Sequence, residues 1–144
     1  MSLPPNDKRP SFPDERLARA YRNADYRVNG TVLKIDESHP DFDRLLAEAG
    51  AEYYIILTAY NPRSTPLPPV INETRHQQLL QLLTARHLRY LPASGSDPAN
   101  DWEEEIGVCL LDPPPEDALE IGRLFEQHAV VEGRRGGAAQ LRWL

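Results

Sequence analysis

The stretch YYIILTAY, residues 53–60, decides the fold because it predicts the central strand of a sheet. It combines aromatic and β-branched residues and carries no charge, as is typical of a strand covered on at least one face. A polar, proline-rich segment, residues 61–71, follows it and leads to Asn72, a favourable N-cap residue. We therefore expect a helix from about Glu73 to Arg86. Its buried stripe consists of Leu79, Leu82 and Leu83.

The rest of the chain continues this alternation of strands and helices. Strands are predicted at residues 88–93, 103–111, 129–132 and 140–144, a helix at residues 116–127 and a turn-rich loop at residues 94–101. From residue 53 the order is therefore β-α-β-β-α-β, the split β-α-β arrangement of ferredoxin-like folds. The predicted fold class is α+β: a two-layer sandwich with this ferredoxin-like core, an N-terminal strand and helix extension, and a C-terminal strand.

The N-terminal part of the sequence predicts an arm, a hairpin and a helix. Residues 1–20 begin with a proline-rich and charged segment and are interpreted as a mobile arm, whereas residues 21–144 form a single α+β domain. Asn29-Gly30 is a favoured pair for a hairpin turn. Pro40 suits the first position of a helix, and Gly50 suits the position just after its end.

Composition excludes several classes of function. The formal net charge of -6 and the pI near 5.2 argue against broad nucleic-acid binding, which depends on clustered Lys and Arg. No apolar stretch approaches the roughly 20 residues that span a bilayer, and the N-terminus lacks the apolar core of a secretory signal, so a cytoplasmic location is expected. Cys109 is the only cysteine and lies in an apolar run, which predicts a buried thiol. The four histidines lack the spacing of a zinc site, so neither metal nor cofactor is expected.

The predicted topology brings polar residues from distant segments to one edge of the sheet. Arg75 lies four residues before Leu79 and extends the helix stripe, while Glu104 alternates with the apolar residues of its strand. A charge buried without a partner is costly, so we expect a bidentate pair between Arg75 and Glu104. The amides of Asn61, Asn72 or Gln127 would support it.

Two interpretations of this predicted cluster remain open. It is either a structural clasp between helix and sheet, or a polar pocket in which Arg75 binds an anion or carbonyl and Glu104 acts as general base or acceptor. Single residues of this cluster also have structural interpretations. Asn72 favours a helix cap, Asn61 a turn, and Trp102 either closes the core or forms an aromatic wall for a flat ligand.

Several motifs resemble, in order and spacing, a bacterial family of domains of unknown function numbered 3293. They are TAYNPRS at residues 58–64, NETR at 72–75, PASGSDPANDWEEE at 92–105 and FEQHAVV at 125–131. The chain departs from the family pattern at Ile106, where serine is frequent, and at residues 126 and 128, where glycine and asparagine are favoured. The resemblance implies no activity. It implies that family positions are occupied by Asn61, Asn72, Arg75, Gly95, Asp97, Trp102, Glu104 and Gln127.

The sequence favours a small domain that binds a polar or anionic small molecule, such as a nucleotide-like compound, at this edge of the sheet. The alternatives are a hydrolase or transferase that uses Glu104 and Arg75, and a regulatory module that associates through a sheet edge. The oligomeric state stays open. The predicted binding residues are Asn61, Asn72, Arg75, Asp97, Trp102, Glu104 and Gln127.

Overall fold

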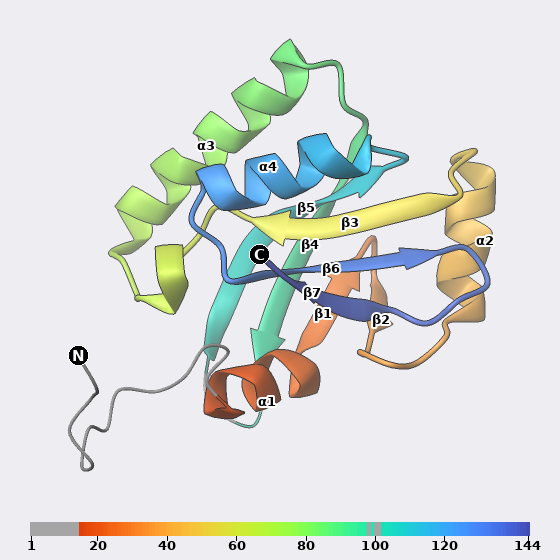
Figure 1. Cartoon of the computed structure of the whole chain (residues 1–144), viewed down its shortest axis with the longest axis horizontal. Coiled ribbons are helices and arrows are strands. Elements are labelled where there is room, and N and C mark those ends of the chain that lie inside the picture. The colour runs from red at the N-terminus through yellow and green to blue at the C-terminus, as the bar shows by residue number, and fades with distance from the viewer. Residues whose placement is uncertain (1–14, 98, 100–101) are drawn as a thin grey trace, which may run out of the picture.

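The computed structural model describes residues 15–97, 99 and 102–144, and of Trp102 the backbone alone. Helices and strands succeed one another along this part of the chain (Figure 1). The helices are α1 (Glu15–Asn23), α2 (Pro40–Glu48), α3 (Pro69–Ala85) and α4 (Pro115–Leu124). The strands are β1 (Asp25–Val28), β2 (Thr31–Leu33), β3 (Tyr53–Thr58), β4 (Tyr90–Asp97), β5 (Trp102–Leu111), β6 (Ala129–Arg134) and β7 (Gln140–Trp143). The predicted α+β class is confirmed.

All seven strands form one antiparallel sheet in the order β2-β1-β4-β5-β3-β6-β7. The strand that begins at Trp102 therefore lies between the two strands that α3 connects. The sheet curls into a half-barrel (Figure 1), because each added strand continues the twist. Isolated bridges from Ile35 to Ala139 and from Ser38 to Ala138 join the segments beside its two edge strands.

Helices cover both faces of this sheet, so the predicted two-layer sandwich describes only one side. The outer face carries α3 and α4, whose Leu79, Leu83 and Leu119 pack with Ile55 of β3. The inner, concave face holds a second apolar cluster that includes Phe42 of α2. Two cores exist because residues on both faces of β3 and β5 are apolar. Within the described residues, no helix combines the length and the apolar character that crossing a bilayer requires.

Local signals placed several elements correctly. Asn29 and Gly30 both have positive φ, 47° and 83°, which confirms the predicted hairpin turn between β1 and β2. Pro40 is the first residue of α2, and Gly50 has a φ of 70° just beyond the end of that helix, as predicted. Cys109 is fully buried in the inner cluster, and burial raises the pKa of its thiol, which confirms a structural cysteine.

Two predicted boundaries are wrong because tertiary contacts override local propensity. The residues Ser94–Asp97, predicted as part of a loop, belong to β4, since Ala93 to Ser96 pair with β1 along the register from Val28 to Asp25. Helix α3 begins at Pro69, one turn before its predicted start, because proline is favoured at the first position of a helix. Asn72 is consequently buried inside the helix and is not its cap.

Helix α1 begins at Glu15, inside the range 1–20 that the sequence assigned to a mobile arm. Its Ala18 is buried, and Tyr21 near its end contacts residues of other elements. Residues 1–14, the rest of that predicted arm, lie outside the described residues.

Candidate functional site

The end of the sheet where β3 stops and β5 starts, called the rim below, brings together segments that are far apart in the sequence. The loop after β3 bonds to α3, because the backbone N–H of Asn61 donates to Asn72 Oδ1 at 2.9 Å. It also bonds to β5, because Asn61 Nδ2 donates to Glu105 Oε2 at 2.7 Å. The segment after α4 joins through Gln127, whose Nε2 donates to the Tyr60 carbonyl at 3.0 Å. The predicted convergence of these segments is confirmed.

Asn61 and Asn72 fix the conformation of the loop after β3 through hydrogen bonds. Asn61 adopts a left-handed conformation, with φ of 48°, which asparagine tolerates better than most residues. Its Oδ1 accepts hydrogen bonds from the Leu67 backbone at 3.0 Å and from Asn72 Nδ2 at 2.7 Å. Both polar side-chain atoms of Asn61 and both of Asn72 thus have hydrogen-bond partners within the protein. These two residues shape the site and offer little to a ligand.

The predicted ion pair between Arg75 and Glu104 is wrong. Arg75 Nε donates to the Ala59 carbonyl at 2.6 Å, and its Nη2 donates to the Phe125 carbonyl at 2.7 Å. Both carbonyls lie just beyond the end of an element and lack a ladder or helix partner, so the fork of donors on the guanidinium satisfies them. Glu104 is exposed and accepts a hydrogen bond from Ser94 Oγ at 3.3 Å.

Sequence reasoning missed Glu105, which is the glutamate of β5 that bonds to Asn61 at the rim. Alternation along β5 puts Glu105 on the inner face with Gly107 and Cys109, and Glu104 on the outer face with Val108. Burial raises the pKa of the Glu105 carboxyl, and the hydrogen bond from Asn61 opposes that shift. The apolar residues on the inner side of the same strand were the signal that could have found it.

A chain of three hydroxyl and ring groups borders the rim. Tyr21 of α1 and Ser64 share a hydrogen bond of 2.9 Å between their hydroxyls, and Ser64 Oγ lies 2.9 Å from His128 Nδ1. Burial and the nearby Arg63 lower the pKa of His128. This chain ties the first described helix to the loops after β3 and α4.

Other predicted residues lie elsewhere or carry other roles. Asp97, the last residue of β4, is buried, and its carboxylate accepts a hydrogen bond from the Ala99 backbone at 3.1 Å. The side chain of Trp102 lies outside the described residues. His76, which the sequence did not single out, is buried beside Tyr60, and its Nδ1 has no hydrogen-bond partner within the described part of the chain.

A groove of about 590 Å³ opens at the rim. Glu103, Glu104 and Glu105 line it, and no lysine or arginine is among the described residues that do so. Its other lining residues are Tyr21, Tyr60, Asn61, Ser64, Pro66, Leu67, Pro69, Asn72 and Gln127. The groove is therefore an acceptor-rich, negatively charged surface with aromatic and proline walls.

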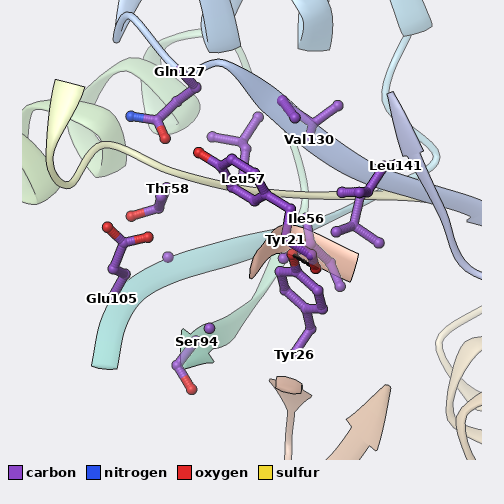
Figure 2. Close-up of a pocket in the computed structure, with 14 residues that line it drawn as sticks. Tyr21, Tyr26, Ile56, Leu57, Thr58, Ser94, Glu105, Gln127, Val130 and Leu141 are labelled. Atoms are coloured by element: carbon purple, nitrogen blue, oxygen red, sulfur yellow. Dashed lines mark hydrogen bonds between the residues drawn. The ribbon is translucent and has the colours of Figure 1, made fainter. Parts of the chain in front are cut away.

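A smaller cavity of about 50 Å³, called the inner cavity, adjoins this groove, and Tyr26, Ile56 and Val131 of the inner cluster are among its lining residues. Tyr21, Glu105 and Gln127 line both spaces. Figure 2 shows the rings of Tyr21 and Tyr26 in the space between Glu105 and Leu141. Beyond its polar mouth the inner cavity is walled mainly by aliphatic side chains.

The chain from residue 57 to residue 130, slightly more than half of its length, matches the family described as "Protein of unknown function (DUF3293)". The chain belongs to this family. The DUF3293 segment contains β3's end, α3, β4, β5 and α4, and thus nearly all of the rim. Tyr21 and Leu141 lie outside it. No curated protein and no solved structure gave a match.

Proposed function

We propose that this DUF3293 protein binds a small polar molecule that carries N–H donors, in the groove at the rim. The observation that carries the proposal is the Glu105 carboxylate, which Asn61 holds through Oε2. The other carboxylate oxygen of Glu105, Oε1, has no hydrogen bond within the described residues. Glu105 lines both the groove and the inner cavity. Concave sites with a few convergent polar groups and a perturbed pKa are the usual places for ligands.

The groove favours a neutral or cationic ligand over an anionic one. Three glutamates line it, and Arg75, the expected anion-binding residue, donates to two backbone carbonyls instead. A phosphate placed here would face carboxylates without a cation to offset them. Among nucleotide-like compounds, a nucleoside fits better than a nucleotide, because the amino edge of its base supplies donors and Tyr60 supplies an aromatic wall.

The two alternative functions receive less support. A hydrolase or transferase built on Glu104 and Arg75 requires the two side chains to act on one substrate, and their hydrogen bonds point them at different partners. A module that associates by sheet extension requires an accessible edge. Beside β2, however, the backbone N–H of Asp36 donates to the Ala139 carbonyl at 2.7 Å, which covers part of that edge.

The order β4-β5-β3-β6 within the sheet supports the further proposal that a ferredoxin-like split β-α-β unit underlies the fold.

The test is a titration of isotopically labelled protein, followed by NMR, with adenosine, cytidine and agmatine as donor-bearing probes. Inorganic phosphate and adenosine monophosphate are the anionic comparison. We expect a donor-bearing probe to shift resonances of the rim and Glu105→Gln to weaken its binding at least tenfold. Glu48→Gln, the same change at an exposed position of α2, is the matched control and should bind as the wild type does. Stronger binding of phosphate than of every donor-bearing probe would overturn the proposal.

A further inference from the structure

The inner cavity is lined in part by two glycines of adjacent strands. Gly95 of β4 pairs with Glu105 of β5, and Gly107 of β5 pairs with Ala93 in the next row. A side chain at Gly107 would meet the Leu57 carbonyl oxygen at 2.4 Å, so the close approach of β3 requires glycine there. A methyl group at Gly95 would lie 3.5 Å from the Tyr26 ring, which is an ordinary contact. The fold therefore does not require glycine at position 95, and the absence of a side chain there leaves space in the inner cavity.

The inner cavity and the groove meet at three polar side chains. Tyr21, Glu105 and Gln127 border both spaces, and Glu105 Oε1 and Gln127 Oε1 have no hydrogen bond within the described residues. Figure 2 shows the amide oxygen of Gln127 on the side of Thr58 and Glu105. Both open atoms are acceptors, which complement the hydrogens of one amino group.

The walls behind this mouth are apolar. Ile56, Val131 and Leu141 line them, and the first two are almost fully buried. The volume of about 50 Å³ exceeds the roughly 10–15 Å³ that one water needs, and is about a third of the roughly 150 Å³ of a cavity that takes benzene. A short, unbranched aliphatic chain fits this volume, whereas an aromatic ring does not.

We propose that the inner cavity is the second half of the ligand site, and that the ligand is a primary amine with a short aliphatic chain. The ammonium group donates to Glu105 and Gln127, and the chain occupies the cavity between Ile56 and Leu141. This inference rests on the proposed function, because it takes the donor group of that ligand to be cationic. A charged donor is favoured over a hydroxyl because hydrogen bonds between ions are about twice as strong as neutral ones.

The experiment is an NMR titration of the full chain with methyl-, propyl- and pentylammonium. Burial of each methylene contributes about 0.8 kcal/mol, so affinity should rise roughly fourfold per methylene until the cavity is full. Gly95→Ala narrows the cavity and should remove the gain in affinity from methyl- to propylammonium. Ile56→Val widens it and should move the optimum toward the longer chain. Propionate, which has a chain of similar size and the opposite charge, should not bind.

The outcomes separate the two proposals. If Glu105→Gln weakens every amine but chain length has no effect in the wild type or in Gly95→Ala, the cavity is not a subsite and the groove proposal stands. If no alkylammonium ion binds while a nucleoside does, the amine inference is overturned alone. If neither class binds, both fail. The opposite responses of the narrowed and widened variants guard against a general loss of folding, because misfolding would weaken all probes in both.

Discussion

Arg75 and Glu105 lie at the same rim but make contrasting contacts. Arg75 lies on the outer face of the sheet and Glu105 on the inner face. Arg75 donates to the carbonyls of Ala59 and Phe125, and its guanidinium lies 5.7 Å from the centre of the Phe125 ring. Glu105 accepts one hydrogen bond within the described residues, from Asn61, and it lines both the groove and the inner cavity.

The contrast separates structural residues from candidate binding residues by their remaining hydrogen-bonding capacity. Arg75 connects the ends of β3 and α4, so its charge serves the fold. Glu105 is retained in a partly buried position although burial disfavours its charged form, as the raised pKa shows. Functional sites often keep residues that are poor for stability. We therefore propose that clasp and pocket, which the sequence left as alternatives for one cluster, are separate parts of one rim.

The largest effect is expected from Arg75→Met. The substitution leaves two backbone carbonyls without their charged donor, and hydrogen bonds to charged groups contribute about 1.5–3 kcal/mol each. We expect the free energy of unfolding, measured by urea denaturation, to fall by about 3 kcal/mol. Arg44→Met, at an exposed arginine of α2, is the control and should change it by less than about 0.5 kcal/mol. An equally small loss for Arg75→Met would mean that Arg75 is not a clasp.

Asn72→Ala should have the next largest effect. Asn72 is 5% exposed and bonds to the backbone N–H and the side chain of Asn61, so its loss leaves groups of the loop unpaired. We expect a loss of about 2 kcal/mol in the free energy of unfolding. Hydrogen exchange at the Asn61 amide should also become faster. Gln78→Ala, on the exposed side of α3, should leave both measurements unchanged.

Glu105→Gln should change stability little and in the favourable direction at neutral pH. Because the pKa of Glu105 is raised in the native state, the unfolded chain releases this proton first as pH rises, so the native state loses stability through that window. Glutamine keeps an acceptor for Asn61 and cannot titrate. Urea denaturation between about pH 4 and about pH 8 should show the gain at the upper end and none at the lower end. A marked loss at neutral pH would place Glu105 with Arg75 as a structural residue.

The smallest effect is expected for the coupling between Arg75 and Glu104. Because the two side chains bond to different partners, the unfolding free energies of Arg75→Met and Glu104→Gln should add within about 0.5 kcal/mol in a double-mutant cycle. A larger coupling energy would show that the two side chains interact in solution, and would return the predicted ion pair to consideration.

Much of the fold could be predicted because its signals are local. The run YYIILT specifies a buried strand, Asn29-Gly30 a hairpin turn, and Pro40 and Gly50 the two ends of a helix. Alternation along β5 predicted that Glu104 shares a face with Val108. The same alternation assigned Glu105 to the opposite face, but sequence reasoning treated only one face as buried.

The sequence by itself determined which segments become strands and helices, and which of them end at the rim, because periodicity and turn residues act within a few positions of one another. Only the tertiary structure decided the partners of the polar groups. The guanidinium of Arg75 met carbonyls that no pattern marks as unpaired, and the curl of the sheet made the inner face of β5 a second buried surface. The candidate site depends on these long-range contacts, since a hydrogen bond is decided by which groups the folded chain brings within about 3 Å of each other.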